Sequence, residues 1–376
     1  MRIRGLCLAL ALIARLGGAL FATETEWKQQ LSAWFSLNDD KPSIPRLALR
    51  YEPDLSLAVA LGKDWKLDSE LSLDLSATGV APSWRSPDID GAIKPYRLWL
   101  RLSSSRFEAR LGLQKINFGS ATLIRPLMWF DSLDPRDPLQ VSEGVYGLLL
   151  RYYFKSNANI WLWGLYGNNE AKGWETLPTA RRTPEFGARF QAPLFSGEAG
   201  LTVHQRCLDP GSDATAFRPT EKRFALDGKW DIGVGLWVET AFVHRDDPAT
   251  ALAWQRSLTA GIDYTFKLGN GLYLLAEQFF SGYTPSMFGS GGDATAISTL
   301  LVRYPIGLLD GLNAIEYYDW QTRRLYTFAG WRRTTDHWQF NLMLFWNPRL
   351  MQTGRAPSGS AMFGGRGFQL MAICNI

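Results

Sequence analysis

Apolar and polar residues alternate along most of this chain, in segments that each end at a turn. Between Ser257 and Phe266 the apolar side chains stand at alternate positions, with polar residues such as Asp263 between them. The same spacing recurs from Arg223 to Asp231 and from His337 to Asn347. Because successive side chains of a β-strand point to opposite faces, a period of two predicts strands rather than helices.

The polar face of these segments carries full charges, and many apolar stripes end in an aromatic residue such as Tyr166, Phe266 or Trp346. A soluble antiparallel protein also alternates, because one face of its sheet packs on a core. Charged lumen faces and aromatic girdles are instead typical of a barrel in lipid, where a tilted strand of about 9 to 11 residues crosses the bilayer. The prediction is an all-β, antiparallel transmembrane barrel in the outer membrane.

Short turns and long loops alternate between the segments, which predicts short periplasmic turns and long outer loops. Seventeen alternating segments follow from Leu55 onward, and Arg46 to Glu52 supplies an eighteenth if Pro53 and Asp54 form a tight outer turn. We therefore expect about 18 strands over residues 46–376, with 16 as the second possibility and one long strand from Arg46 to Leu61 as an alternative. A barrel of this size encloses an aqueous lumen.

The beginning of the chain has the plan of a secretory signal peptide over residues 1–22. Arg2 and Arg4 precede a short apolar run, and small residues follow it. Cleavage is expected after Ala22, with Ala19 as an alternative. Removing this segment lowers the formal net charge from +4 to +1, because it contains three arginines, so overall charge indicates no particular partner.

Residues 23–45 are expected to form a short amphipathic helix and a linker outside the barrel wall. Thr23 and Glu26 have the spacing of a capping box, and Trp27, Leu31 and Trp34 share one helical face. Two positions remain open for this helix, one at the periplasmic rim and one as a plug inside the lumen.

Two cysteines, Cys207 and Cys374, remain after the signal peptide. The expected strand order places them at opposite ends of the barrel. Bridged Cα atoms must lie within about 7 Å of each other, so no disulfide is expected.

Charged residues at alternate positions of the strands should face the aqueous lumen, because charges in hydrocarbon are costly. Arginines dominate the earlier strands and acids become commoner later, so we expect an electropositive wall on the earlier strands, unless the charges simply pair with one another. The predicted pore-lining residues are Arg97, Arg101, Glu108, Arg110, Arg151, Glu185, Arg189, Arg206, Asp227 and Lys229.

The longest predicted outer loop, Lys115 to Glu143, is rich in aromatic and aliphatic residues. Gly112 to Gly119 reads Gly-Leu-Gln-Lys-Ile-Asn-Phe-Gly, and Asp134-Pro135 follows in the loop. This sequence resembles that of the porin-like outer-membrane families, in which a similar strand end leads into a long loop that contains Asp-Pro. The resemblance implies that the third outer loop folds into the lumen and narrows it. One departure is the chain end, Cys374-Asn375-Ile376, where many such barrels have an aromatic residue on the last strand.

Within this loop, charged residues are expected to shape the constriction. We expect Asp131, Asp134 and Asp137 to be exposed to the lumen near the arginines of the wall, creating a transverse electric field. Alternatively, the acids pair with neighbouring arginines and merely anchor the loop. The predicted constriction residues are Arg125, Asp131, Asp134, Arg136 and Asp137.

The function that fits this pattern is passive diffusion of small hydrophilic solutes through an outer-membrane channel, with membrane lipid and the solutes as partners. The alternative is a closed barrel that acts as a surface lipase or protease or as an assembly scaffold. His204 is a candidate base for such an enzyme, but the three histidines lack metal-ligand spacing and no enzyme activity, cofactor, metal or nucleic acid is expected. The oligomeric state is not indicated by the sequence.

Overall fold

A computed structural model describes residues 23–39, 45–80, 88–211, 218–246, 252–290, 292, 294–348 and 363–376. These residues form 18 β-strands that pair into one sheet. The strands are β1 (Thr23–Asn38), β2 (Arg46–Leu61), β3 (Trp65–Val80), β4 (Asp88–Ser103), β5 (Phe107–Gln114), β6 (Val145–Tyr153), β7 (Asn159–Tyr166), β8 (Pro184–Leu194), β9 (Gly197–Cys207), β10 (Thr220–Asp231), β11 (Gly235–Asp246), β12 (Trp254–Phe266), β13 (Leu272–Thr284), β14 (Ala294–Ile306), β15 (Asp310–Asp319), β16 (Arg324–Thr334), β17 (Trp338–Trp346) and β18 (Arg366–Asn375).

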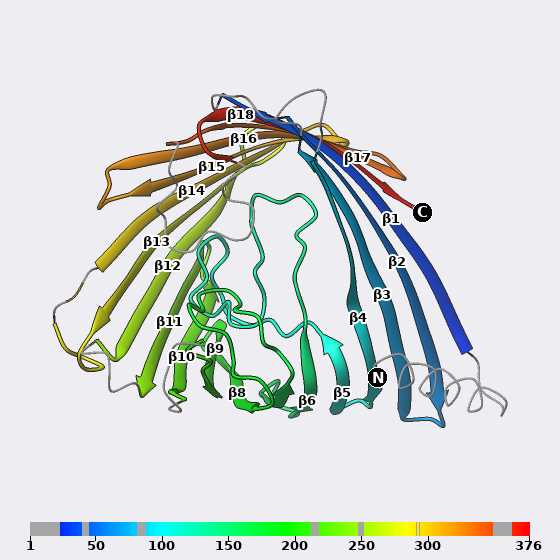
Figure 1. The fold of residues 1–376 in the computed structure, drawn as a ribbon, viewed down its shortest axis with the longest axis vertical. Helices are drawn as coiled ribbons and strands as arrows, with labels where there is room; N and C mark the ends of the chain where they lie inside the picture. The colour runs from blue at the N-terminus through cyan, green and yellow to red at the C-terminus, as the bar shows by residue number, and fades with distance from the viewer. Residues whose placement is uncertain are drawn as a thin grey trace.

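The sheet closes into an antiparallel barrel (Figure 1). Each strand pairs with the next one along the chain, and β18 pairs back with β1 from Gln30↔Asn375 to Asn38↔Gly367. Closure leaves neither edge of the sheet unpaired, so the backbone groups of the wall have partners within lipid. The all-β antiparallel barrel and the expected count of 18 strands are confirmed.

The prediction of a helix after the signal peptide is wrong, because Thr23–Asn38 is strand β1. It pairs with β2 on one side and β18 on the other. Trp27 and Leu31 are exposed on the outer surface, whereas Ser32 and Ser36 are buried on the other face. Trp27 and Leu31, which fitted one helical face, also fit alternate strand positions, whereas Trp34 falls on the opposite face of the strand. The neighbouring strand edges decide between the two conformations.

The expected turn at Pro53-Asp54 is also wrong, since both residues lie within β2, which runs unbroken from Arg46 to Leu61. The register between β2 and β3 pairs Tyr51 with Leu75 and resumes at Asp54 with Ser72. Proline has no N–H to donate to a sheet, and Pro53 lies at this interruption. The count of 18 strands is therefore right, but the additional strand is β1.

The two faces of the wall differ in chemistry, as the alternation predicts. Exposed aliphatic and aromatic side chains such as Leu49, Leu111, Phe190 and Leu258 cover the outside. Charged side chains at the intervening positions point inward, where many of them are buried against loops. The outside therefore has the apolar surface that a bilayer requires.

The connections alternate in length around the barrel. Those at one end, such as 62–64 and 195–196, have two to five residues. Those at the other end include 115–144, 167–183 and 347–365, with a short exception at 320–323. Backbone hydrogen bonds between Gln29 and Ile376 place the start of β1 and the end of β18 at the end with short turns. By the rule for bacterial barrels this end is periplasmic.

The predicted signal peptide, residues 1–22, lies outside the described residues.

Cys207 ends β9 at the outer side, and Cys374 lies on β18 near the periplasmic end. Among the described residues, no helix is long and apolar enough to cross a membrane.

Candidate functional site: the long loop inside the barrel

The connection between β5 and β6, residues 115–144, folds into the space enclosed by the strands (Figure 1). Counting from β1, it is the third connection at the outer end. Its backbone and side chains contact inward-facing residues of β10 to β13, which lie across the barrel from β5. The structure thus places the loop inside the wall.

Glu239 on β11 holds the first part of the loop through its carboxylate. The backbone amides of Ser120 and Ala121 donate to Oε2 at 2.8 and 2.9 Å, and the amide of Leu127 donates to Oε1 at 2.6 Å. The Glu239 side chain is buried. Amide donors surround the carboxylate, so backbone groups supply the partners that a buried charge needs.

Glu277 on β13 holds the next three residues in the same way. Thr122 donates its amide to Oε1 at 2.6 Å, and Leu123 and Ile124 donate theirs to Oε2, both at 2.9 Å. Trp237 adds an indole N–H to Oε1 at 3.0 Å. Two wall glutamates therefore accept six backbone N–H groups from the segment 120–127.

Gly119 allows the loop backbone to lie close to the Glu239 carboxylate. Its φ is +102°, and a Cβ at this position would lie 2.4 Å from the Glu239 carboxylate oxygen. Any other residue would meet both a strained backbone and a steric clash. The glycine at the end of the Gly112 to Gly119 motif is thus explained by the contact between the loop and the wall.

Apolar packing supports the hydrogen bonds at both ends of this segment. Ala121, Leu123 and Ile124 are buried among inward-facing apolar residues of β11 and β13 to β17. Ile116, Phe118, Leu127, Trp129 and Phe130 form a second cluster with inward-facing residues of β6, β7, β10 and β11. The loop therefore fills a large part of the lumen with a packed apolar core.

A second outer connection, residues 167–183, also bends inward and packs on the first loop (Figure 1). Trp174 donates its indole N–H to the Arg125 carbonyl at 2.7 Å and stacks on Phe279, with ring centroids 5.3 Å apart. Glu175 forms ion pairs with Arg206 at 2.9 Å and with Arg223 at 2.6 Å. This second loop therefore ties the long loop to the wall at the outer side.

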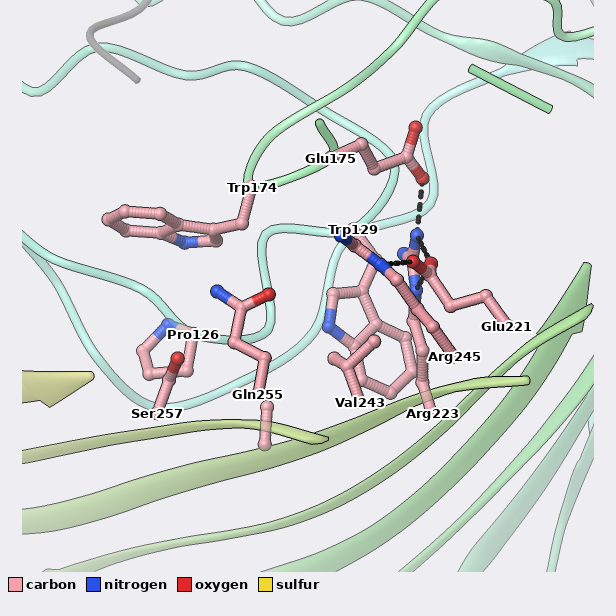
Figure 2. Close-up of a pocket in the computed structure, with 11 residues that line it drawn as sticks. Pro126, Trp129, Trp174, Glu175, Glu221, Arg223, Val243, Arg245, Gln255 and Ser257 are labelled. Atoms are coloured by element: carbon pink, nitrogen blue, oxygen red, sulfur yellow. Dashed lines mark hydrogen bonds and ion pairs between the residues drawn. The ribbon is translucent and has the colours of Figure 1, made fainter. Parts of the chain in front are cut away.

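Figure 2 shows where the two loops meet the wall at β10 to β12. Glu221 accepts Arg206 and Arg223 on one carboxylate oxygen and Arg245 on the other. The cavity that remains between Trp129, Trp174 and this cluster measures about 20 Å³. That is room for about one water molecule, so the two loops pack closely against this part of the wall.

A much larger hollow lies beside residues 135–140 of the loop. It measures about 620 Å³ and separates Pro135–Gln140 from the inner wall of β14 to β17 near the periplasmic turns. Arg303, Asn313, Arg332 and Asn341 line it from the wall, and Arg136 and Asp137 line it from the loop. This hollow is a polar space of the size that small solutes need.

The predicted constriction residues are all inside the barrel, but they pair mainly within the loop. Arg125 lies 3.7 Å from Asp131 and also donates to the Phe118 carbonyl. Arg136 forms an ion pair with Asp134 at 2.7 Å. The expectation that Asp131 is exposed to the lumen is wrong, because its exposed fraction is 1 %.

Burial affects the acidity of two of these loop carboxyls. It raises the pKa of Asp131, although the neighbouring Arg125 and Lys115 oppose the shift. Burial also raises the pKa of Asp137, against backbone hydrogen bonds from Leu139 and Val141 and the attraction of Arg50 on β2. Asp137 also lines the hollow that contains Arg303 and Arg332.

The predicted pore-lining residues all stand at inward positions of their strands. Those on the earlier strands pair along the wall, with Arg101 to Asp68 at 2.8 Å and Arg110 to Glu108 at 3.0 Å. Arg151 shares Glu108 at 3.6 Å, and Arg97 donates to the Ser142 carbonyl of the long loop at 2.9 Å. These ion pairs correspond to the alternative of mutual pairing.

The later predicted pore-lining residues lie under the loops rather than beside water. Arg189 pairs with Asp227 at 2.6 Å, and Glu185 lies 3.2 Å from His204. Arg206 is 1 % exposed. Lys229 remains exposed and lies over the Trp237 ring. The expectation that these later residues line an aqueous pore is therefore wrong for the buried ones, since the loops cover them.

His204 does not have the surroundings of a catalytic base. Its Nδ1 accepts the indole N–H of Trp163 at 3.2 Å, and its Nε2 faces Glu185. The rings of Trp129 and Phe130 pack beside it, and the residue is 3 % exposed. Both ring nitrogens are occupied by structural contacts, so His204 has no route to a substrate here; the absence of enzyme activity stays a prediction.

Sequence reasoning did not assign the two glutamates that hold the loop, nor Trp174 and Glu175 of the second loop. The alternation placed Glu239 and Glu277 on the inner face, but nothing local connects them to residues more than 100 positions away. The length of the connection 167–183 was the available signal for the second loop.

No protein-family model matches the chain, and no curated protein matches it. Solved structures do match its fold. OccAB1 of Acinetobacter baumannii has a TM-score of 0.57 at 8 % identity, over 94 % of this chain and 96 % of that one. OccK7 of Pseudomonas aeruginosa has a TM-score of 0.52 at 12 % identity, over 94 % and 99 % of the two chains. The anion-selective porin of Comamonas acidovorans has a TM-score of 0.50 at 12 % identity, over 94 % and 100 %. The chain has the fold of the outer-membrane porins. At such low sequence identity the similarity concerns the architecture alone. It agrees with the closed ring of strands and the apolar outer face of the barrel.

Proposed function

We propose that this barrel is an outer-membrane channel for the passive diffusion of small hydrophilic solutes, narrowed by its third outer loop. The observation that carries the proposal is the polar hollow of about 620 Å³ between the loop and the inner wall. An 18-stranded ring is too wide to be filled by the side chains of its own strands. The loops fill much of the interior and leave this polar space near the periplasmic turns of β14 to β17.

The fold similarity supports the same function, because solved proteins of this architecture include an anion-selective porin. In the proposed channel, the narrow part lies where Pro135–Gln140 approaches the wall of β14 to β17. Asp137 stands on the loop side, and Arg303 and Arg332 stand on the wall side. Opposite charges across a water-filled gap create a transverse field, which discriminates solutes by charge.

The test is single-channel conductance of the purified protein in planar bilayers. The wild-type protein is expected to give discrete open-channel currents in salt solution. Replacing Asp137 with Lys should raise the anion-to-cation permeability ratio by about twofold or more, because it makes the loop side of the gap basic. Asp336→Lys, in an exposed periplasmic turn, is the matched control and should leave the ratio unchanged.

A wild-type barrel that folds and inserts but passes no current would contradict the channel. An unchanged permeability ratio in Asp137→Lys, with normal conductance, would instead leave the channel intact and remove Asp137 from the selectivity mechanism. The first result tests whether the barrel is a channel, and the second tests only the role of Asp137 in its selectivity.

A further inference from the structure

Two cations stand on the lipid-facing side of the wall at its outer end. On β10, Glu221 and Arg223 point inward into the buried cluster of Figure 2. The intervening Lys222 therefore points outward, and it is exposed. On β12, Ser257 is buried on the inner side and Leu258 is exposed on the outside. Arg256, two positions before Leu258, shares this outer face.

The sheet register brings these residues together with aromatic side chains. Lys222 pairs with His244 of β11, which pairs with Trp254 of β12. One step toward the membrane, Phe242 of β11 pairs with Arg256. Strand spacing and rise place the Cα atoms of Lys222 and Arg256 about 12 Å apart, so both long side chains reach one headgroup.

Aromatic rings lie beside both cations of this patch. His244 lies 4.6 Å from Trp254 between ring centroids. Phe288, from the connection after β13, is 81 % exposed, and its ring lies 6.2 Å from that of Phe242 on the outer surface. Exposed aromatic side chains of this kind lie at the level of the lipid headgroups.

The charges of the patch are unmatched within the described part of the chain. There, neither Lys222 nor Arg256 has an ion-pair partner, and the acid on the same face of β11 is Asp246 at the strand end. The lipid-facing arginine at the periplasmic end is different, since Arg333 lies 3.7 Å from Asp310. A cation near hydrocarbon is costly unless an anion or water meets it.

We propose that Lys222 and Arg256 form a binding site for a phosphorylated glycolipid headgroup of the outer leaflet. Arginine and lysine donate charge-assisted hydrogen bonds to phosphate oxygens. Phe242 and Phe288 contact the upper part of the acyl chains, and Trp254 lies beside the headgroup at the level of Lys222. The site is on the outside of the barrel, so it does not depend on conduction through the lumen.

The experiment measures lipid A binding to the purified full-length barrel in detergent by native mass spectrometry, with dephosphorylated lipid A as the comparison. The wild-type protein should bind lipid A at least about tenfold more tightly than the dephosphorylated form. The double variant Lys222→Gln and Arg256→Gln should lose about tenfold in affinity for lipid A. The matched control is Lys267→Gln and Arg333→Gln, which removes two charges at the periplasmic end and should bind as the wild type does.

Equal binding of lipid A by the double variant and the wild type would overturn the proposal. Equal binding of the two lipids by the wild type would overturn it as well, because acyl chains alone would then account for the association. That second comparison uses only the wild-type protein, so it decides the matter even where the double variant fails to fold. The conservative variant Lys222→Arg and Arg256→Lys should retain the wild-type affinity.

Discussion

At the residue scale, the most informative groups are the two wall glutamates that accept backbone amides of the long loop. Glu239 and Glu277 lie two strands apart and together hold residues 120–127. A carboxylate can accept hydrogen bonds from several donors at once. The amides of residues 120–127 need such acceptors because this segment has no regular secondary structure. Removing the acceptor would leave buried N–H groups without partners, which costs about 1 to 3 kcal/mol for each group.

Replacing Glu277 with Gln is therefore expected to loosen the loop while the barrel stays folded. The carboxamide keeps the size of the side chain but replaces one acceptor oxygen with a donor that faces Leu123 and Ile124, or Thr122 in the flipped orientation. We expect a larger single-channel conductance and faster proteolysis within residues 115–144. Glu198→Gln, at an exposed position near a periplasmic turn, is the control and should behave as the wild type. A loop that remains protease-resistant in Glu277→Gln would show that the apolar clusters hold it without the carboxylate.

At the scale of elements, β1 decides how the barrel closes. Its polar positions carry both charged and small residues, and its apolar positions are spaced so that they also suit a helix. A strand at this place gains hydrogen bonds from both β2 and β18, whereas a helix at the rim would leave those edges open. The closure of the ring therefore stabilises the extended conformation.

The pairing of β1 with β18 can be tested with an engineered disulfide. Leu31 of β1 pairs with Cys374 of β18, and both face outward. The Cα atoms of such a pair are about 5.5 Å apart, which falls within the range of disulfide bonds. Leu31→Cys in a Cys207→Ser background should form a disulfide with Cys374 on oxidation, detected by mass spectrometry of the joined peptides.

Ala33→Cys in the same background is the control, because residue 33 pairs with Ala372 and has no cysteine opposite. A barrel in which residues 23–38 form a helix at the rim would give no specific cross-link in Leu31→Cys, or equal cross-linking in both variants.

At the scale of the whole molecule, different interactions hold the wall and the loops in place. The wall is a ring of paired strands with an apolar outer face, and it is complete without the loop. The loops pack against inward-facing residues of most strands from β6 to β17 and leave the hollow near the periplasmic turns of β14 to β17. The wall therefore supplies the surface for insertion in the membrane, and in the proposed channel the loops would set its width.

Replacing residues 120–138 with a short Gly-Ser linker is expected to leave a folded barrel with a higher conductance. Folding is checked by heat-modifiable migration on a gel and by β-rich circular dichroism in detergent, and the channel by planar bilayers. Unfolding of this variant would mean that the loop core is needed to hold the wall, and an unchanged conductance in a folded variant would place the solute path away from the loop.

The sequence by itself determined which residues face lipid and which face the interior, because alternation is a local property of an extended chain. It also indicated the alternation of short turns and long loops from residue 62 onward, although the first outer connection that it gave, at Pro53-Asp54, is wrong. Tertiary structure alone decided that Thr23–Asn38 is a strand, because hydrogen bonds to β2 and β18 outweigh a helical spacing of aromatic residues. It alone decided which inward charges meet water and which are buried, because that depends on where residues 115–144 and 167–183 fold. Contacts such as Glu277 with Ile124 join positions 153 residues apart, and no pattern within a segment records them.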